Sequence, residues 1–236
     1  RAERLLLEYD GSQFAGWARQ PGLRTVQGVL QEALGTVLRR PAELTVAGRT
    51  DRGVHARGQV ASHAGEPAPL RNLNAVLPGD VSALASEAAA DAFDARRDAR
   101  SRTYRYRVLT RAAPSPFERG RALWWPRPLD RTALDTCAEA LVGRHDFTAF
   151  TPTDTDHVRF ERHVLRAEWL EEPNEVLAFW IEADTFMRQM VRILVGTMLE
   201  GVRPERFARL LEGATRSEAG ATAPAHGLYL ESVAYP

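Results

Sequence analysis

The sequence predicts an α+β protein, in which each half of the chain mixes antiparallel strands with one or two helices. Three patterns indicate this class. Residues 101–109 alternate with period two, so Tyr104, Tyr106 and Val108 share one face of a strand. Residues 25–38 carry apolar side chains at the 3.6-residue spacing of a helix. Residues 163–171 and 175–184 read as two strands of a hairpin joined by a short turn.

The sequence of the amino half, 1–100, predicts strands before and after each helix. A strand over 4–10 ends at a turn, and Thr25 is positioned as the N-cap of the helix that follows. Short strands are predicted over 43–48 and 58–63, on either side of a glycine-rich stretch. A short helix within 69–80 ends at a Pro-Gly turn. The alanine-rich segment 81–90 is interpreted as a further strand.

The carboxyl half, 101–236, starts with the alternating strand 101–109. A proline-rich connection over 114–128 leads to a helix that begins near Asp130. After the hairpin, helices are predicted over about 186–200 and 204–213, followed by a closing strand near 227–235. Cys137 lies in an apolar helical pattern and is expected to be a small core residue rather than a nucleophile.

Composition excludes several classes of protein. The chain has 236 residues, enough for two packed halves, and one cysteine, so we expect a reducing compartment, the cytoplasm. No apolar run reaches the roughly 20 residues of a membrane span. The 31 basic and 31 acidic residues cancel, which argues against non-specific nucleic-acid binding. Residues 95–107, however, contain six arginines and two tyrosines against one aspartate. That pattern suits phosphate pairing and base stacking, and equally a charged strand edge.

The stretch "AGRTDRGVHARGQ", residues 47–59, places Asp51 between Arg49 and Arg52. A carboxylate there can be a nucleophile, a general base, a metal ligand or a turn cap. Metal binding has little support, because His55 and His63 are eight residues apart and no cysteine pair is present. A glycosidase requires a pair of carboxylates, and no second acid lies near Asp51 in the sequence. Spacing alone leaves both a turn cap and a catalytic group open.

Seven segments, in order from residue 8 to 235, resemble the tRNA pseudouridine synthase A family. "GRTDRGVHARGQV" is similar to the family signature around its catalytic aspartate. The family's other segments are matched by "EYDGSQFAGWARQPGLRTVQGVLQEAL", "NLNAVLPGDV", "FDARRDARSRTYRYRV", "GRHDFTAF", "FMRQMVRILVG" and "TAPAHGLYLESV". Each segment alone is weak evidence for the family, but the occurrence of all seven in the family's order is specific to it. Arg52 stands where the family usually has alanine, and 151–164 follows the family least, so neither receives a role.

The resemblance implies roles for single residues. Asp51 matches the catalytic aspartate, Arg192 the basic residue paired with it, and Tyr104 the tyrosine that stacks on the target base. Arg49 matches an arginine that helps to extrude the nucleotide. We also expect substrate binding by a set drawn from the same motifs: His55, Arg96, Arg97 and Arg105. Without the resemblance, core packing is the favoured interpretation of Tyr104, and a surface position is the favoured interpretation of Arg192.

The resemblance also implies a fold and a reaction. Two related halves would join their mainly antiparallel strands into one extended sheet, with helices on one side and an active-site cleft between the halves. The enzyme would be an isomerase, an intramolecular transferase that converts uridine to pseudouridine at positions 38–40 of the tRNA anticodon stem-loop. It would need no cofactor or metal and would act as a cytoplasmic homodimer. A non-catalytic RNA-binding protein, a synthase with another RNA target and a nucleoside hydrolase are the competing functions.

Overall fold

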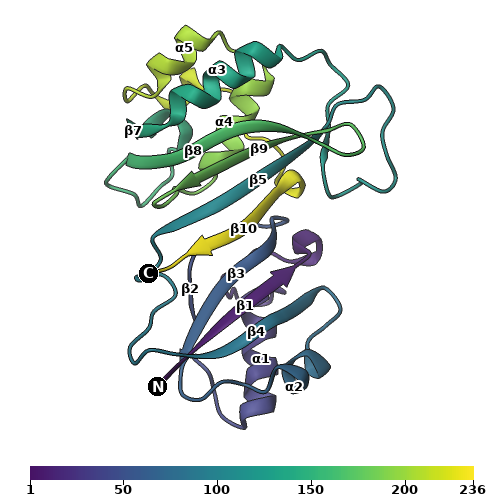
Figure 1. Cartoon of the computed structure of the whole chain (residues 1–236), viewed down its shortest axis with the longest axis vertical. Helices are drawn as coiled ribbons and strands as arrows, with labels where there is room; N and C mark the ends of the chain where they lie inside the picture. The colour runs from purple at the N-terminus through teal and green to yellow at the C-terminus, as the bar shows by residue number, and fades with distance from the viewer. The chain divides into compact units, whose positions relative to one another are not determined.

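The computed structural model describes residues 1–236, which form two compact units (Figure 1). The first unit comprises Arg1–Arg102 and Tyr229–Pro236, and the second comprises Thr103–Leu228. Five α-helices and ten strands, paired mainly antiparallel, confirm the predicted α+β class. The units differ from a division at residue 100 in two respects: the boundary lies after Arg102, and the last eight residues belong to the first unit. They do so because β10 (Leu228–Ala234) pairs in parallel with β3 (His55–Ala64).

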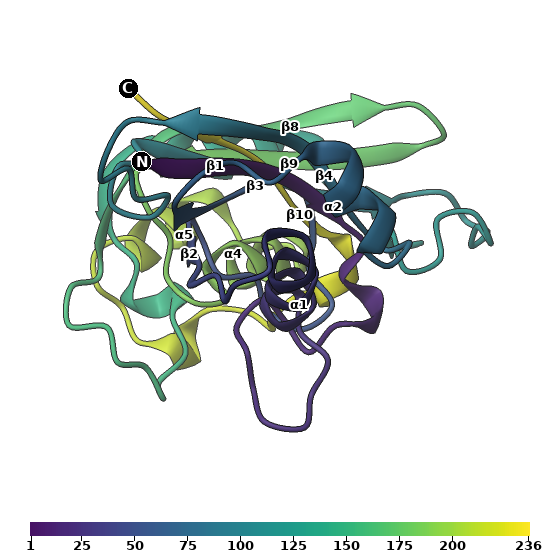
Figure 2. The same ribbon diagram turned by 90° about the horizontal axis from the view of Figure 1, so that it is seen from below.

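The first unit is built around strand β1 (Ala2–Tyr9). In this unit the strand order is β4 (Val81–Ala89), β1, β3 and β10, and the two-residue strand β2 (Thr45–Val46) also pairs with β3. β1 runs antiparallel to both of its neighbours. Helix α1 (Val26–Leu38) begins as predicted, with the Thr25 side chain accepting from Gly28 N. It packs on one face of the sheet (Figure 2), while α2 (Leu70–Val76) contacts β4.

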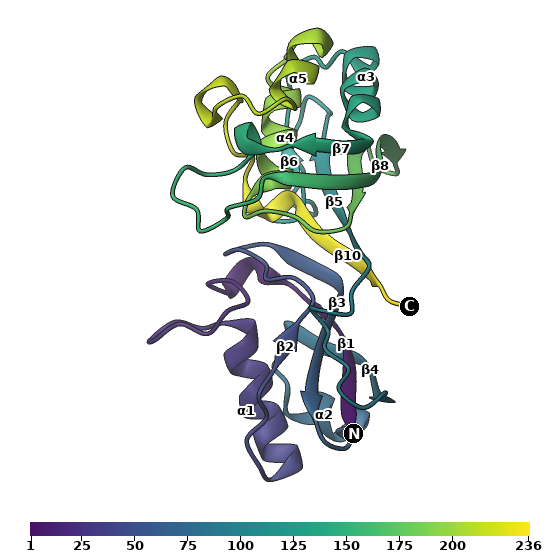
Figure 3. The same cartoon turned by 90° about the vertical axis from the view of Figure 1, so that its left-hand side faces the viewer.

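The second unit has the strand order β5 (Ser101–Leu109), β9 (Val176–Ala183), β8 (Glu161–Glu172) and β7 (Gly143–Asp146). The short strand β6 (Leu123–Trp124) pairs in parallel with β5. Helices α3 (Arg131–Leu141), α4 (Met190–Leu199) and α5 (Pro204–Leu210) gather on one side of β7 and β8 (Figure 3). The predicted hairpin is confirmed by β8 and β9, and the helix expected near Asp130 is confirmed by α3.

Short 3₁₀ turns complete the chain: Gly11–Gln13, Thr148–Phe150, Arg216–Glu218 and Ala225–Gly227. No helix combines the length and apolar character needed to cross a membrane. Cys137 is buried in α3, as predicted.

Several predicted boundaries are wrong for local reasons. The strand predicted over 43–48 is only two residues long, and β3 begins at His55 rather than at residue 58. The turn between them therefore occupies fewer residues than expected. Helix α4 begins at Met190 rather than near residue 186, because Gln189 adopts a left-handed backbone with φ of 60°. The short strands β6 and β7 were not predicted, since two to four residues carry too little periodicity.

Candidate active site

Asp51 lies in the turn that joins β2 to β3. The backbone closes this turn: Val54 N donates to Asp51 O at 3.1 Å, and Gly53 has a φ of 79°, a conformation that favours glycine. The closing bond thus uses the Asp51 carbonyl, and the carboxylate takes no part in it. Asp51 is half-buried, while Arg49 and Arg52 on either side are exposed. The predicted turn between two strands is confirmed.

A buried chain of hydrogen bonds holds the residue before Asp51. The Thr50 hydroxyl lies 2.7 Å from the Tyr9 hydroxyl. Gln59 Nε2 donates to that same Tyr9 oxygen at 3.2 Å and to Gly48 O at 2.7 Å. Tyr9, Thr50 and Gln59 are all buried. Residues on β1, on the turn and on β3 are therefore connected through three side chains.

Glycines on the segment after β1 permit close backbone contact with the same turn. Trp17 N donates to Thr50 O at 2.9 Å. A Cβ on Gly16 would lie 3.0 Å from Thr50 O, and Gly16 has a φ of 112°. A Cβ on Gly11 would lie 1.9 Å from Val54 O, a distance that no side chain tolerates. The turn is thus clamped by backbone as well as by side chains.

Arg102 is a buried cation that sequence reasoning missed. Its Nη2 donates to Ala47 O at 2.8 Å and to Arg96 O at 3.0 Å, so it ties the base of the Asp51 turn to the arginine-rich segment. The signal was present in the sequence, because Arg102 falls on the same alternating face as Tyr104 and Tyr106. An arginine at an inward strand position must find buried acceptors.

His55 lies in the interior beside this turn. The residue is 2% exposed, and its Nδ1 accepts a hydrogen bond from Gly11 N at 3.0 Å. The same nitrogen is 3.3 Å from Asp10 Oδ1, and the ring centroid is 4.7 Å from that of Tyr229. His55 therefore joins β3 to the turn after β1 and to β10.

The predicted RNA-binding arginines differ in their surroundings. Arg96 and Arg97 are exposed on a loop whose backbone is fixed by Asp94, since Asp94 Oδ1 accepts from both of their amides at 2.8 Å. Arg105 instead has a side chain only 12% exposed and forms an ion pair with Glu172 at 3.1 Å. The Arg105 guanidinium also lies over the Trp180 ring. The first two arginines are available to solvent, whereas the third is engaged within the second unit.

Tyr104 and Arg192 belong to the second unit. Tyr104 is 8% exposed on β5, and Phe186 meets its ring edge-on with centroids 5.0 Å apart. Arg192, in the first turn of α4, is half-buried, and its Nε donates to Ala223 O at 2.7 Å. Arg192 is therefore not an ordinary surface arginine.

Tyr106, two residues along β5 from Tyr104, is held by the same segment as Arg192. Its hydroxyl donates to Pro224 O at 2.7 Å, next to the Ala223 carbonyl that receives Arg192. Burial raises the pKa of Tyr106 despite the opposing charge of Arg192. Side chains from β5 and α4 thus fix one stretch of backbone before β10.

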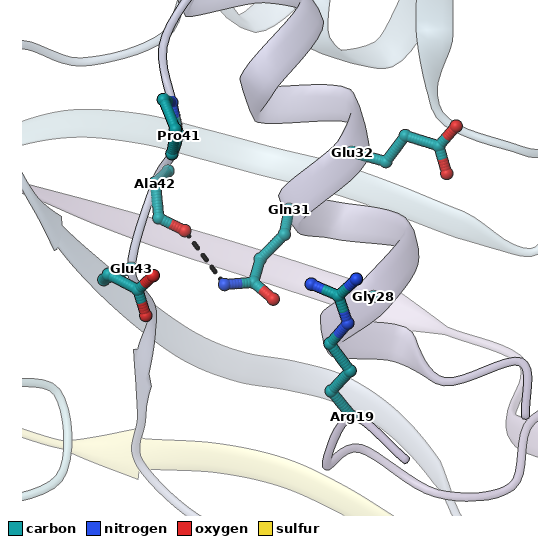
Figure 4. Close-up of a pocket in the computed structure, with 7 residues that line it drawn as sticks. All are labelled: Arg19, Gly28, Gln31, Glu32, Pro41, Ala42 and Glu43. Carbon is teal, nitrogen blue, oxygen red and sulfur yellow. Dashed lines mark hydrogen bonds between the residues drawn. The ribbon is translucent and has the colours of Figure 1, made fainter. Parts of the chain in front are cut away.

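A polar pocket in the first unit lies apart from all predicted site residues. It opens between α1 and the chain before β2, where Gln31 Nε2 donates to Ala42 O at 3.0 Å (Figure 4). Its walls are Arg19, Gly28, Gln31, Glu32, Pro41, Ala42 and Glu43. No group of three or more His, Cys, Asp or Glu side chains is arranged to hold a metal ion.

Comparison with known proteins agrees with these motifs. A family model described as tRNA pseudouridine synthase matches residues 137–236. The tRNA pseudouridine synthase A of Frankia casuarinae is 48% identical over 99% of this chain and 89% of its own length. The tRNA pseudouridine synthase A of Thermus thermophilus is 43% identical over 98% of this chain and 96% of its own length. That of Solibacter usitatus is 39% identical over 100% of both chains.

A solved structural neighbour is more distant. A chain from the crystal structure of a Cbf5-Nop10-Gar1 complex aligns with 96% of this chain and 57% of its own length, at 11% identity and a TM-score of 0.38. The sequence relatives span nearly the whole chain at far higher identity. By that similarity, this chain belongs to the tRNA pseudouridine synthase A family.

Proposed function

We propose that this protein isomerises uridine to pseudouridine in tRNA, at positions 38–40 of the anticodon stem-loop. The observation that supports the reaction most directly is Asp51, half-buried in a clamped turn inside the family's signature motif. In the reaction the bond from ribose C1′ to uracil N1 breaks and a bond from C1′ to C5 forms. The proton leaves C5 and N1 regains one, so atoms balance without an added reagent.

Asp51 is the proposed catalytic carboxylate. As nucleophile or as base it must be ionised, and a nearby cation favours the ionised form of an acid. Arg192 is proposed to supply that cation. Its hydrogen bond to Ala223 O fixes one edge of the guanidinium, whose planar set of N–H donors matches the geometry of a carboxylate.

Tyr104 and Arg49 are proposed to act on the flipped-out nucleotide. Extruding a base costs a few kcal/mol, and stacking on an aromatic ring returns about 1–3 kcal/mol. Edge-on contact with Phe186 restrains the Tyr104 ring, so less freedom remains to be lost on stacking. Arg49 is exposed in the Asp51 turn, where a guanidinium suits a phosphate of the target nucleotide.

Arg96 and Arg97 are the proposed contacts to the tRNA backbone. Both are exposed on a loop whose backbone Asp94 orders. Arg105 pairs with Glu172, and His55 accepts from Gly11 N. We therefore propose that these two residues support the binding surface from within the fold, while Arg96 and Arg97 make the initial contact with the RNA. The protein is further proposed to work as a homodimer in the cytoplasm. Light scattering of the purified protein, with and without tRNA, tests the dimer.

Tritium release tests the reaction. Wild-type protein incubated with tRNA carrying 5-tritiated uridine should release tritium to water, and Asp51→Asn should release none above background. Asp91→Asn is a matched control, because it neutralises an exposed carboxylate of the same unit and should behave as wild type. If Asp51→Asn keeps the wild-type rate, the catalytic role of Asp51 is wrong. Binding of tRNA without any release by wild type would favour the RNA-binding alternative.

The position of modification needs a separate experiment. Pseudouridine is mapped at single-nucleotide resolution in unmodified tRNA after treatment with the protein. New pseudouridine at positions 38–40 supports the proposed target. Pseudouridine at other positions would support the proposed reaction and contradict the proposed target.

A further inference from the structure

The amide of Gln59 has only one orientation that satisfies its surroundings. Gln59 is fully buried, its Oε1 accepts from Val60 N at 3.2 Å, and its Nε2 donates to Gly48 O at 2.7 Å. If Oε1 and Nε2 exchanged places, an amide nitrogen would face the donor Val60 N and an amide oxygen would face the acceptor Gly48 O. The second proton of Nε2 therefore goes to the Tyr9 oxygen.

The direction of the next hydrogen bond follows from the first. The Tyr9 oxygen accepts from Gln59 and has one proton of its own to place. Leaving a buried hydroxyl proton without an acceptor is costly, and the Thr50 oxygen lies 2.7 Å away. Tyr9 therefore donates to Thr50. Burial raises the pKa of Tyr9 to about 12, against the smaller effects of Thr50 and Gln59, so this proton is retained at neutral pH.

Thr50 is thereby held at two points directly before Asp51. Its side chain accepts from Tyr9, and its backbone carbonyl accepts from Trp17 N at 2.9 Å. Gly48, two residues earlier, is held by Gln59. We propose that Tyr9 and Gln59 are positioning residues, which keep the backbone around Asp51 in one arrangement through directed hydrogen bonds to Thr50 and Gly48.

This inference rests on the proposed function, because it concerns the placement of the catalytic carboxylate. A catalytic group misplaced by about 1 Å can lose about 100-fold in rate. Loss of the Tyr9 hydroxyl takes a partner from both Thr50 and Gln59, while the ring that fills the core remains. The turn would then sample more than one arrangement. The expected consequence is a slower chemical step with little change in tRNA affinity.

The test compares two tyrosine-to-phenylalanine variants. Tyr9→Phe removes the hydroxyl bonded to Thr50. Tyr235→Phe removes a hydroxyl of the same unit that donates to Ala95 O at 2.6 Å and not to Thr50. The measurement is the single-turnover rate of tritium release at saturating tRNA, together with the Kd for tRNA and the melting temperature.

We expect Tyr9→Phe to lower the single-turnover rate about 10- to 100-fold with Kd changed less than about 2-fold. Tyr235→Phe should lose a similar amount of thermal stability but keep its rate within about 2-fold. At position 50, Thr50→Ser retains the hydroxyl and should stay near wild type, whereas the isosteric Thr50→Val should match Tyr9→Phe. The Thr50 pair decides the question if Tyr9→Phe melts below the assay temperature.

Equal rates for Tyr9→Phe and Tyr235→Phe, with Thr50→Val as active as Thr50→Ser, would overturn the inference. The proposed function would survive that result, because wild type still releases tritium. Absence of release by wild type would instead overturn the proposed function. A rise in Kd that accounts for the whole loss of activity would also contradict positioning of the chemical step.

Discussion

Glu3 and His63 form an ion pair in the interior of the first unit, directly opposite each other on β1 and β3. Both side chains are almost completely buried. The Glu3 carboxylate also accepts from Ala68 N at 3.1 Å and from the Ser86 hydroxyl. Burial disfavours the charged imidazole, but its hydrogen bonds to Glu3 and Ala64 O, together with the negative charge of Glu3, outweigh burial and raise the pKa of His63.

This pair predicts that stability depends on pH. The pKa of His63 is raised above the unfolded value of about 6.5, so the pair contributes fully below that pH. The contribution is lost as pH rises through the folded pKa. At pH 6, Glu3→Gln should lower the free energy of unfolding by about 1–3 kcal/mol, because His63 loses its charged partner and gives up its proton in the buried site. Urea unfolding of wild type and variant between pH 5.5 and 8.5 measures the difference.

The control for this prediction is Glu66→Gln, which breaks the exposed pair of Glu66 with Arg1. An exposed pair contributes at most about 1 kcal/mol, so this variant should stay close to wild type. The difference between wild type and Glu3→Gln should shrink as pH rises. A difference that is constant over the whole range would show that His63 does not carry the charge.

Gly11 predicts a strong effect of a single methyl group. A Cβ at this position would lie 1.9 Å from Val54 O and 2.6 Å from Val54 C, both backbone atoms. Gly11→Ala must therefore shift the chain beside the Asp51 turn, at a cost of about 3 kcal/mol, the upper end of the usual range for overpacking. Gly79→Ala is the matched control, since nothing lies within 4 Å of its Cβ. Urea unfolding should separate the two; equal stabilities would mean that the turn yields easily.

Local patterns predicted much of this fold. The alternation of 101–109 is confirmed, with Tyr104, Tyr106 and Val108 buried on one face of β5. The Thr25 cap is also confirmed. It could be predicted because a cap depends only on residues up to three positions away. Strand β4 formed in spite of its alanines, since pairing with β1 overrides a weak propensity.

The contacts around Asp51 could not be predicted from such patterns. Tyr9 meets Thr50 across 41 residues of chain, and Arg102 meets Ala47 across 55. Contacts at this separation follow from strand pairing and leave no periodic signal. The contact of His55 with Gly11, which places the ring in the interior, is equally invisible to local patterns, and substrate binding by His55 stays a prediction. The family motif located the turn, and the role of each residue in it stays a prediction.

Cys137 predicts slow thiol chemistry. Burial, with a smaller effect of Glu205, raises the pKa of this thiol to about 11, and the side chain is 1% exposed. Because the thiolate is the reactive form, the native protein at pH 8 should react with a disulfide reagent far more slowly than the urea-unfolded chain. Absorbance of the released thiol follows both reactions. Rapid stoichiometric reaction of the native protein would mean that α3 opens readily.

Arg96 and Arg105 predict opposite results in binding and stability. Exposed Arg96 is proposed to neutralise a tRNA phosphate, so Arg96→Gln should reduce the slope of log binding constant against log salt by about 0.7–0.9. Arg105 is held by Glu172, with both side chains largely buried, so Arg105→Gln should lower stability by about 1–3 kcal/mol and leave the slope unchanged. Filter binding across a salt series and urea unfolding measure the two quantities. If Arg105→Gln changes the slope as much as Arg96→Gln does, Arg105 must leave Glu172 when tRNA binds.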